Sequence, residues 1–317
     1  MAVNPTAPRH KVLVAVDGSE QSLRAIRYAA NVFPSHRTHI VLFHVQEQLS
    51  QLYADLDAYP HFKRRVTGMK RWATEQKVDI DNTMNSAVAY FRQRGFAPSD
   101  VSIRTPAKRL GVAEDILKES YDGYHAVVVG RTGWSRFKDW LFKSTAMKLV
   151  AKIKHIPVVV VGGKPDVGHL LVAFDGSHGA MRGVVCVGAL LSGSDHHVRL
   201  YSMIDGAEKF WEGDDPYFIP CRTDAAVNTA RHAIGAGLEE ACRRLADEGA
   251  PAERISIKIQ VVDGDRPSRI VEEAEANQIG SVVVGRRGVV SFIDAYLVGR
   301  VSEQVLKRAD QLAVWII

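Results

Sequence analysis

The sequence predicts an α/β protein made of two doubly wound domains, each with a five-stranded parallel sheet of strand order 3-2-1-4-5 flanked by helices. Three observations lead to this fold class. The same landmarks occur twice within the 317 residues. Within each half, short Val- and Ile-rich runs alternate with segments of helical periodicity, as in parallel sheets whose strands are joined by helices. Each half also has the length of an ordinary domain with its own core.

The repeat has a period of about 155 residues, much longer than the roughly 20 to 50 residues of solenoid units. The segment 127–133 (VVVGRTG) returns as 282–288 (VVVGRRG), and 14–19 (VAVDGS) returns as 172–177 (VAFDGS). Between the halves, segment 162–168 (GGKPDVG) suits a short linker. We therefore expect one domain over residues 1–162 and another over 168–317, called the first and second repeat below.

The first repeat opens with a β-rich run, after which Leu23, Ile26, Ala30 and Phe33 fall on one helical face. Ser19 is placed to cap that helix, and Gly95 suits the left-handed end of a later one. The expected order is strand 11–17, the capped helix, strand 38–45, a long helix, strand 101–104, helix 112–119, strand 125–130, helix 144–153 and strand 157–161.

The second repeat follows the same order, with strands expected at 169–175, 197–204, 254–262, 280–285 and 311–317. Right-handed crossovers between such strands give a doubly wound sheet. Ligands of these sheets bind beyond the carboxyl ends of the strands, where the strand order reverses. The last strands of both repeats are apolar edges, so we expect the two to pair about a pseudo-two-fold axis.

Composition points to ordinary globular domains, because 46% of the residues are hydrophobic and 24% are charged. No apolar run approaches the roughly 18 residues of a membrane span, and residues 1–10 hold no signal-peptide core. A cytoplasmic protein without a membrane partner is therefore expected.

The three cysteines form no CxxC pair, so no metal site is predicted. The net charge of +5 comes with no nucleic-acid-binding motif, so nucleic acid is not an expected partner.

Two residue types stand at the expected ligand edge of each repeat. Asp17 and Asp175 follow the first strand, and Gly130 and Gly285 follow the fourth. A carboxylate there can accept hydrogen bonds from ribose hydroxyls or an adenine amino group. Glycines let backbone N–H groups approach phosphate beside a helix N-terminus. Each feature alone is more typical of a tight turn or a helix cap than of a ligand site, but their joint repetition in both halves favours a nucleotide site.

These segments resemble the universal stress protein family, and the resemblance covers nearly the whole chain. The family's nucleotide signature is G-x2-G-x9-G-[ST], preceded by an Asp that closes the first strand. The first repeat has Gly130-x2-Gly133-x9-Lys143-Ser144, followed by Thr145. Lys143 thus replaces the third glycine.

The second repeat departs from the signature in another way. It has Gly285-x2-Gly288-x10-Gly299-Arg300, followed by Val301 and Ser302. One extra residue alters the spacing, and Arg300 replaces the hydroxyl residue. A left-handed Lys143 would strain its loop by about 1–2 kcal/mol, whereas both Lys143 and Arg300 could also attract phosphate.

The resemblance implies that ATP, ADP or AMP binds in one or both repeats, with Mg²⁺ as an accompanying ion, in a stress-response regulatory role. No catalytic residue is predicted, so slow ATP hydrolysis is the most activity expected. The implied nucleotide-binding residues of the first repeat are Ala15, Asp17, Val45, Val129, Gly130, Thr132, Gly133, Lys143, Ser144 and Thr145. Those of the second are Ala173, Asp175, Val284, Gly285, Arg287, Gly288, Gly299, Arg300, Val301 and Ser302.

A second function class stays open, because the altered signatures also fit a scaffold of the same fold that binds no nucleotide and acts through unknown protein partners. An ATP pyrophosphatase is disfavoured, because segment 17–19 (DGS) is too short and acidic for a phosphate loop. By analogy with the family, the whole chain is also expected to form a homodimer.

Overall fold

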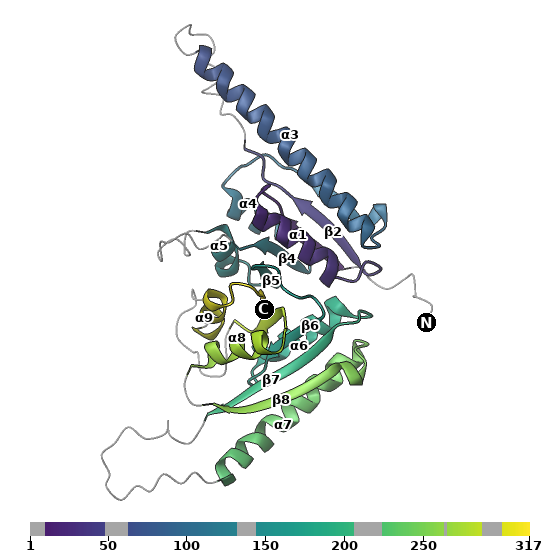
Figure 1. Ribbon diagram of the computed structural model, residues 1–317, viewed down its shortest axis with the longest axis vertical. Helices are drawn as coiled ribbons and strands as arrows, with labels where there is room; N and C mark the ends of the chain where they lie inside the picture. Colours follow the sequence, from purple (N-terminus) through teal and green to yellow (C-terminus); the bar gives the residue numbers. More distant parts are fainter. Residues whose placement is uncertain (1–9, 48–62, 132–143, 206–223, 263–264, 287–299) are drawn as a thin grey trace, which may run out of the picture. The chain divides into compact units, whose positions relative to one another are not determined.

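The computed structural model describes residues 10–47, 63–131, 144–205, 224–262, 265–286 and 300–317 (Figure 1). The chain forms two compact units. The first unit comprises Met1–Ala30 and Ser35–Ile153, and the second comprises Asn31–Pro34 and Lys154–Ile317. Within the described ranges, no helix is long and apolar enough to cross a membrane.

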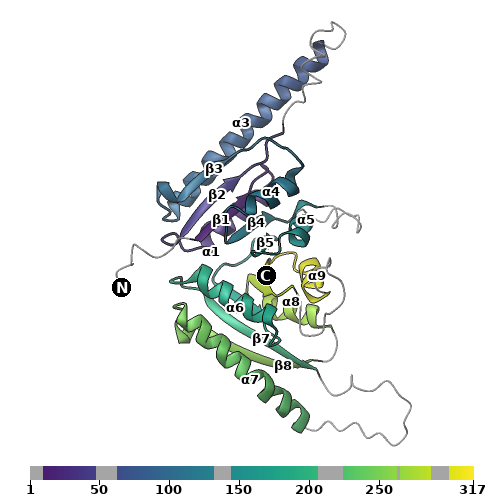
Figure 2. The same cartoon turned by 180° about the vertical axis from the view of Figure 1, so that it is seen from behind.

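The first unit is a parallel α/β sheet. Its strands are β1 (His10–Ala15), β2 (Thr38–Phe43), β3 (Val101–Arg104) and β4 (Ala126–Gly130). β1 lies between β2 and β4, and β2 pairs with β3 on its other side. The helices are α1 (Glu20–Val32), α3 (Lys63–Gln93), α4 (Val112–Ser120) and α5 (Thr145–Lys152). Figures 1 and 2 show α3 running alongside β2 and β3 and continuing past the sheet.

The second unit repeats this design. Its parallel strands are β6 (His169–Ala173), β7 (His197–Asp205), β8 (Ile255–Val262), β9 (Ser281–Val284) and β10 (Ala313–Ile316). The helices are α6 (His178–Leu191), α7 (Asp224–Asp247), α8 (Arg266–Ala276) and α9 (Arg300–Arg308). Helix α6 contacts α7, and α8 contacts α9. The strand order is 3-2-1-4-5 in this repeat and in the first, which confirms the predicted fold class.

The fifth strands of the two repeats pair with each other. β5 (Val158–Val161) lies antiparallel to β10, with Val158 opposite Ile316 and Val161 opposite Ala313. The ladder continues beyond the strand, because the N–H of Gly162 donates to the Leu312 carbonyl at 2.9 Å. β5 therefore belongs to the second compact unit, and the predicted pairing of the two apolar edges is confirmed.

The cores follow from the near-continuous apolar strands. All residues of β5, β9 and β10 are buried, as expected for strands covered on both faces. Trp315 of β10 is fully buried, and its ring lies 5.7 Å from that of Phe33 between centroids. Phe33 was expected on the α1 face, but α1 ends at Val32, and Phe33 belongs to the short segment that joins the second unit.

The expected helix ends are present. The Ser19 hydroxyl accepts from the N–H of Ser22 at 3.2 Å, which caps α1. Gly95 follows α3 with φ +90°, the left-handed conformation expected there, and Gly249 follows α7 with φ +94°.

A carboxylate on the helix after the third strand forms an ion pair in both repeats. Glu119 of α4 accepts from Arg104 of β3, with 2.5 Å between Oε1 and Nη1. At the equivalent place, Glu273 of α8 accepts from Lys258 of β8 at 2.6 Å and also from Arg199 of β7 at 2.8 Å. The sequence repeat thus preserves an ion pair between the third strand and the helix that follows it.

We expect Glu273→Gln to lower the free energy of unfolding by about 1–2 kcal/mol, because two cations lose their charged acceptor inside the protein. The Glu273 side chain is 6% exposed, whereas Glu272, which pairs with Arg269, is 58% exposed. Glu272→Gln is therefore the matched control and should change stability by less than about 0.5 kcal/mol. Urea denaturation of both variants measures the difference, and equal effects would contradict the account.

Candidate functional site

The first strand of the first repeat ends in a closed turn. β1 stops at Ala15, two residues before the expected end, and Asp17 is exposed. Its Oδ1 accepts from the Ser19 N–H at 3.0 Å and from the Ser19 hydroxyl at 2.5 Å. Gly18 has φ +79°, which its lack of a side chain allows. The turn therefore fixes the Asp17 carboxylate at the start of α1.

The second repeat builds the same turn. Oδ1 of Asp175 accepts from the Ser177 N–H at 3.0 Å, and the Ser177 hydroxyl caps α6 by accepting from the Ala180 N–H at 3.1 Å. Gly176 has φ +78°. The turn hydrogen bonds of both Asp residues use Oδ1, and Oδ2 takes no part in them.

The fourth strand of each repeat touches the first turn of the helix that follows the first strand. A Cβ on Gly130 would lie 2.4 Å from the carbonyl carbon of Gln21 in α1. A Cβ on Gly285 would lie 2.8 Å from the carbonyl carbon of Gly179 in α6. Only glycine permits this approach. It brings the end of the fourth strand, the helix N-terminus and the Asp turn to one place.

The long helices pack against the glycines of these turns. The Cδ1 atom of Ile80 in α3 lies 3.1 Å from the position of a Cβ on Gly18. In the second repeat, Cδ1 of Ile234 in α7 lies 3.8 Å from the same position on Gly176. Each Asp turn therefore has an apolar neighbour from the helix between the second and third strands.

The apolar residues predicted to line the sites belong to the core or its border. Val45, Val129 and Val284 are buried, and Ala15 and Ala173 are half-buried at the ends of β1 and β6. Their side chains can support the edge on which a ligand would rest.

The structure describes only part of the predicted phosphate loops. Ser144 caps α5 by accepting from the Met147 N–H at 3.2 Å, and Thr145 beside it is exposed. Arg300 begins α9, Val301 is exposed, and Ser302 is buried with 1% exposure. The remaining predicted contacts lie outside the described residues: Thr132, Gly133, Lys143, Arg287, Gly288 and Gly299.

In each repeat one arginine directly follows the fourth strand, and neither arginine was among the predicted site residues. Arg131 is buried, and Arg286 is half-buried. Burial, together with the smaller effect of the positive charge of Arg182, lowers the pKa of Arg286 to about 10. The signal in the sequence was the repeated Gly-Arg dipeptide. The position of the arginine near the ligand edge could be recognised only from the folded structure.

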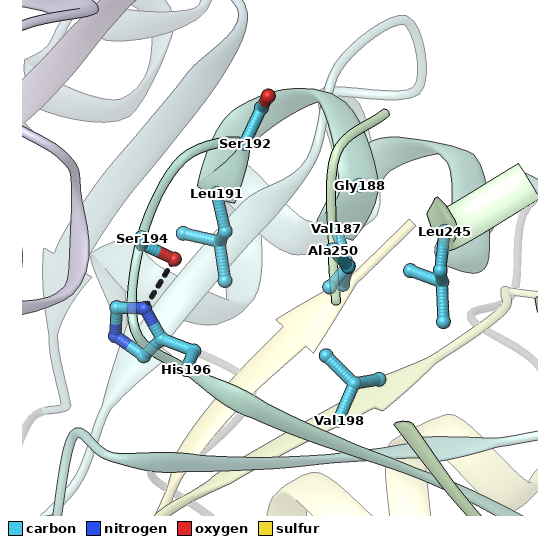
Figure 3. Close-up of a pocket in the computed structure, with 9 residues that line it drawn as sticks. All are labelled: Val187, Gly188, Leu191, Ser192, Ser194, His196, Val198, Leu245 and Ala250. Carbon is cyan, nitrogen blue, oxygen red and sulfur yellow. Dashed lines mark hydrogen bonds between the residues drawn. The ribbon is translucent and has the colours of Figure 1, made fainter. Parts of the chain in front are cut away.

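A small cavity lies at the opposite edge of the second unit, before β7 (Figure 3). It encloses about 20 Å³, room for about one water molecule, and is lined mostly by apolar side chains of α6, α7 and β7. Figure 3 shows the His196 ring at its border, with Nδ1 2.7 Å from the Ser194 hydroxyl. The cavity is too small for a nucleotide.

The His196 ring is held in its neutral form. Burial is the main cause that lowers the pKa of His196 to about 4, and His169 and Arg254 act in the same direction. The carboxylate of Asp195 and a hydrogen bond with the Val167 backbone oppose this shift. Arg254 donates a hydrogen bond to Asp195 at 2.7 Å. The two charges of this ion pair therefore act on His196 in opposite directions.

We expect the second unit to lose stability as the pH falls from about 6.5 to about 4. The unfolded His196 takes up its proton near pH 6.5, whereas the folded one does so near pH 4. Between these values the unfolded state binds more protons, so acid favours unfolding. Urea midpoints measured from pH 7.5 to 4.5 should fall less steeply for His196→Gln than for the wild type. Parallel pH profiles would contradict this assignment.

Comparison with known proteins agrees with the fold. The sequence model of the Universal stress protein family matches residues 8–162 and again residues 167–317. The chain is similar to a solved universal stress protein from Archaeoglobus fulgidus DSM 4304, with 19% identity and a TM-score of 0.61, over 99% of this chain and 97% of that one. It is also similar to a functionally unknown protein from Pseudomonas aeruginosa PAO1, with 17% identity and a TM-score of 0.51, over 99% and 93%.

A third solved structure, a universal stress protein in complex with cAMP, matches over 47% of this chain and 94% of its own, with 23% identity and a TM-score of 0.33. No curated protein matches the chain. The two family matches account for both repeats, and the whole-chain likenesses show the same doubled fold. The chain therefore belongs to the universal stress protein family and carries the family's domain twice.

Proposed function

We propose that the protein binds an adenine nucleotide (ATP, ADP or AMP) at the carboxyl edge of one or both repeats, and that occupancy regulates its part in a stress response. The main observation in support is that the same three groups lie close together at this edge in both repeats. In each repeat, the Asp turn, the N-terminus of the next helix and the glycine after the fourth strand meet at one place. Family membership supports the same assignment.

The chemistry of these groups suits a nucleotide. Oδ2 of Asp17 or Asp175 can accept hydrogen bonds from ribose hydroxyls. The N-terminal end of a helix favours phosphate through its N–H groups and its dipole. In the first repeat, α5 starts directly after the predicted phosphate loop, and Thr145 is exposed at its first position. A magnesium ion would accompany the triphosphate of ATP.

A scaffold that binds no nucleotide is the second candidate, and one observation favours it in the second repeat. Ser302, the hydroxyl residue nearest the altered end of that signature, is buried, so a ligand in solvent does not reach it in this conformation. Such a scaffold would act through protein partners.

For either function, we propose a cytoplasmic homodimer whose domains span residues 1–162 and 168–317.

Mass spectrometry of the small molecules released on denaturing the gently purified protein tests the proposal. We expect an adenine nucleotide from the wild type and less of it from Asp17→Asn and Asp175→Asn. Asn keeps the Oδ1 acceptor of the turn but replaces Oδ2 with an NH₂ group, which cannot accept from ribose. Asp247→Asn, an exposed change at the end of α7, is the matched control and should leave the amount unchanged.

If the wild type releases no nucleotide and also fails to bind added ATP, ADP and AMP, the scaffold reading replaces the proposal. If nucleotide is released equally by all variants, binding occurs elsewhere and the proposed site is wrong.

A further inference from the structure

The second repeat brings two arginines together at its carboxyl edge. Gly179 and Gly183 lie one turn apart on the face of α6 that meets the sheet. A Cβ on Gly183 would lie 3.3 Å from Cγ1 of Val283 and 3.7 Å from Cγ1 of Ile317. Arg182 therefore projects from the turn of α6 that lies over the ends of β9 and β10.

Arg286 starts beside the same turn. It follows Gly285, which touches the Gly179 backbone, and its N–H donates to the Ile317 carbonyl at 3.0 Å. Ile317 is also one of the residues beside Gly183. The electrostatic effect of Arg182 on Arg286 agrees with this placement. In the described part of the chain, no carboxylate forms an ion pair with Arg182.

The first repeat retains the arginines but adds a carboxylate. By the spacing that relates Asp17 to Asp175, Arg182 corresponds to Arg24 and His178 corresponds to Glu20. Arg131 follows Gly130 as Arg286 follows Gly285. In the first repeat, Oε1 of Glu20 lies 2.5 Å from Nη2 of Arg24, so an internal anion already neutralises that arginine. His178 provides no such carboxylate in the second repeat.

We propose that Arg182 and Arg286 form a phosphate-binding pair in the second repeat, so that this repeat binds polyphosphate groups more tightly than the first. Two guanidinium groups offer planar sets of N–H donors that match phosphate oxygens, and a bound anion relieves their mutual repulsion. The preference for a nucleotide rests on the proposed function, whereas the capture of phosphate rests on the arginines alone. The two repeats then differ in affinity through one exchange, Glu20 for His178.

Isothermal titration calorimetry with inorganic tripolyphosphate, ATP and adenosine tests the pair in the full chain. Arg182→Gln and His178→Glu are surface changes in α6, and each should weaken tripolyphosphate and ATP binding about tenfold. Arg24→Gln is the matched control, because Glu20 already neutralises that residue, and it should leave the tighter site unchanged. Glu20→His should strengthen binding at the first repeat.

The outcomes separate the two proposals. ATP binding that responds to Asp175→Asn but not to Arg182→Gln or His178→Glu would overturn the arginine pair and keep the nucleotide site. Tripolyphosphate binding that responds to both α6 variants, with ATP no tighter than tripolyphosphate and no effect of Asp175→Asn, would support the pair and count against the adenine nucleotide. If tripolyphosphate does not bind, the pair is wrong.

Discussion

Replacing Trp315 by Ala should lower the free energy of unfolding of the second unit by about 3–5 kcal/mol. Trp315 is fully buried in β10, where it stands between Val283 of β9 and Val159 of β5 in the sheet. Its ring also packs near Phe33. Truncation would leave a cavity where strands from both sequence repeats meet, and the rigid sheet around it can collapse only in part.

Denaturation in urea, followed by circular dichroism at 222 nm, measures this effect. Trp315→Phe keeps a large aromatic ring and should cost clearly less than Trp315→Ala. Leu110→Ala is the control for a surface change, because Leu110 is 76% exposed, and it should stay within about 0.5 kcal/mol of the wild type. A loss below about 1 kcal/mol for Trp315→Ala would show that the β5–β10 pairing is not a rigid part of the core.

The second large effect is expected for Gly130→Ala, which should destabilise the first unit by about 3 kcal/mol. The added methyl group would lie 2.4 Å from both the carbonyl carbon and the oxygen of Gln21, and these backbone atoms belong to α1. Either β4 or the start of α1 must move. Because the Asp17 turn leads directly into α1, the same change should weaken nucleotide binding in the first repeat.

Gly235→Ala provides a control of opposite sign. Gly235 lies in α7, and a Cβ there would meet no atom within 4 Å. Alanine is the better helix former, so we expect a gain of about 0.5–1 kcal/mol. Thermal denaturation of both variants tests the pair. Similar melting temperatures for Gly130→Ala and the wild type would contradict the close contact between β4 and α1.

Much of the fold could be predicted because local sequence determines it. The buried strands appear as apolar runs, and all ten strands lie where they were expected to within about two residues. The predicted end of the first strand was wrong, because the chain leaves the strand after Ala15 to form the turn at Asp17. That turn also requires the left-handed conformation of Gly18. The pairing of β5 with β10 was predictable because two apolar edges cannot both face water.

The rest depends on contacts between distant segments. The steric reason for Gly130 requires the position of α1, and the ion pairs of Glu119 and Glu273 require a helix to lie over a particular strand. The burial of Ser302 depends on where α9 begins and which face it turns inward. For the candidate site, the Asp turn could therefore be predicted, whereas the arrangement of charge around Arg286 could not.

The most direct test of the account is a calorimetric titration of the full chain with ATP, carried out on the wild type, Asp17→Asn, Asp175→Asn and the double variant. We predict that the wild type binds ATP, that Asp175→Asn removes the tighter binding, and that the double variant binds none. Wild-type affinity and stoichiometry in the double variant, or no binding by the wild type, would contradict the central claim that the doubled carboxyl edge is a nucleotide site.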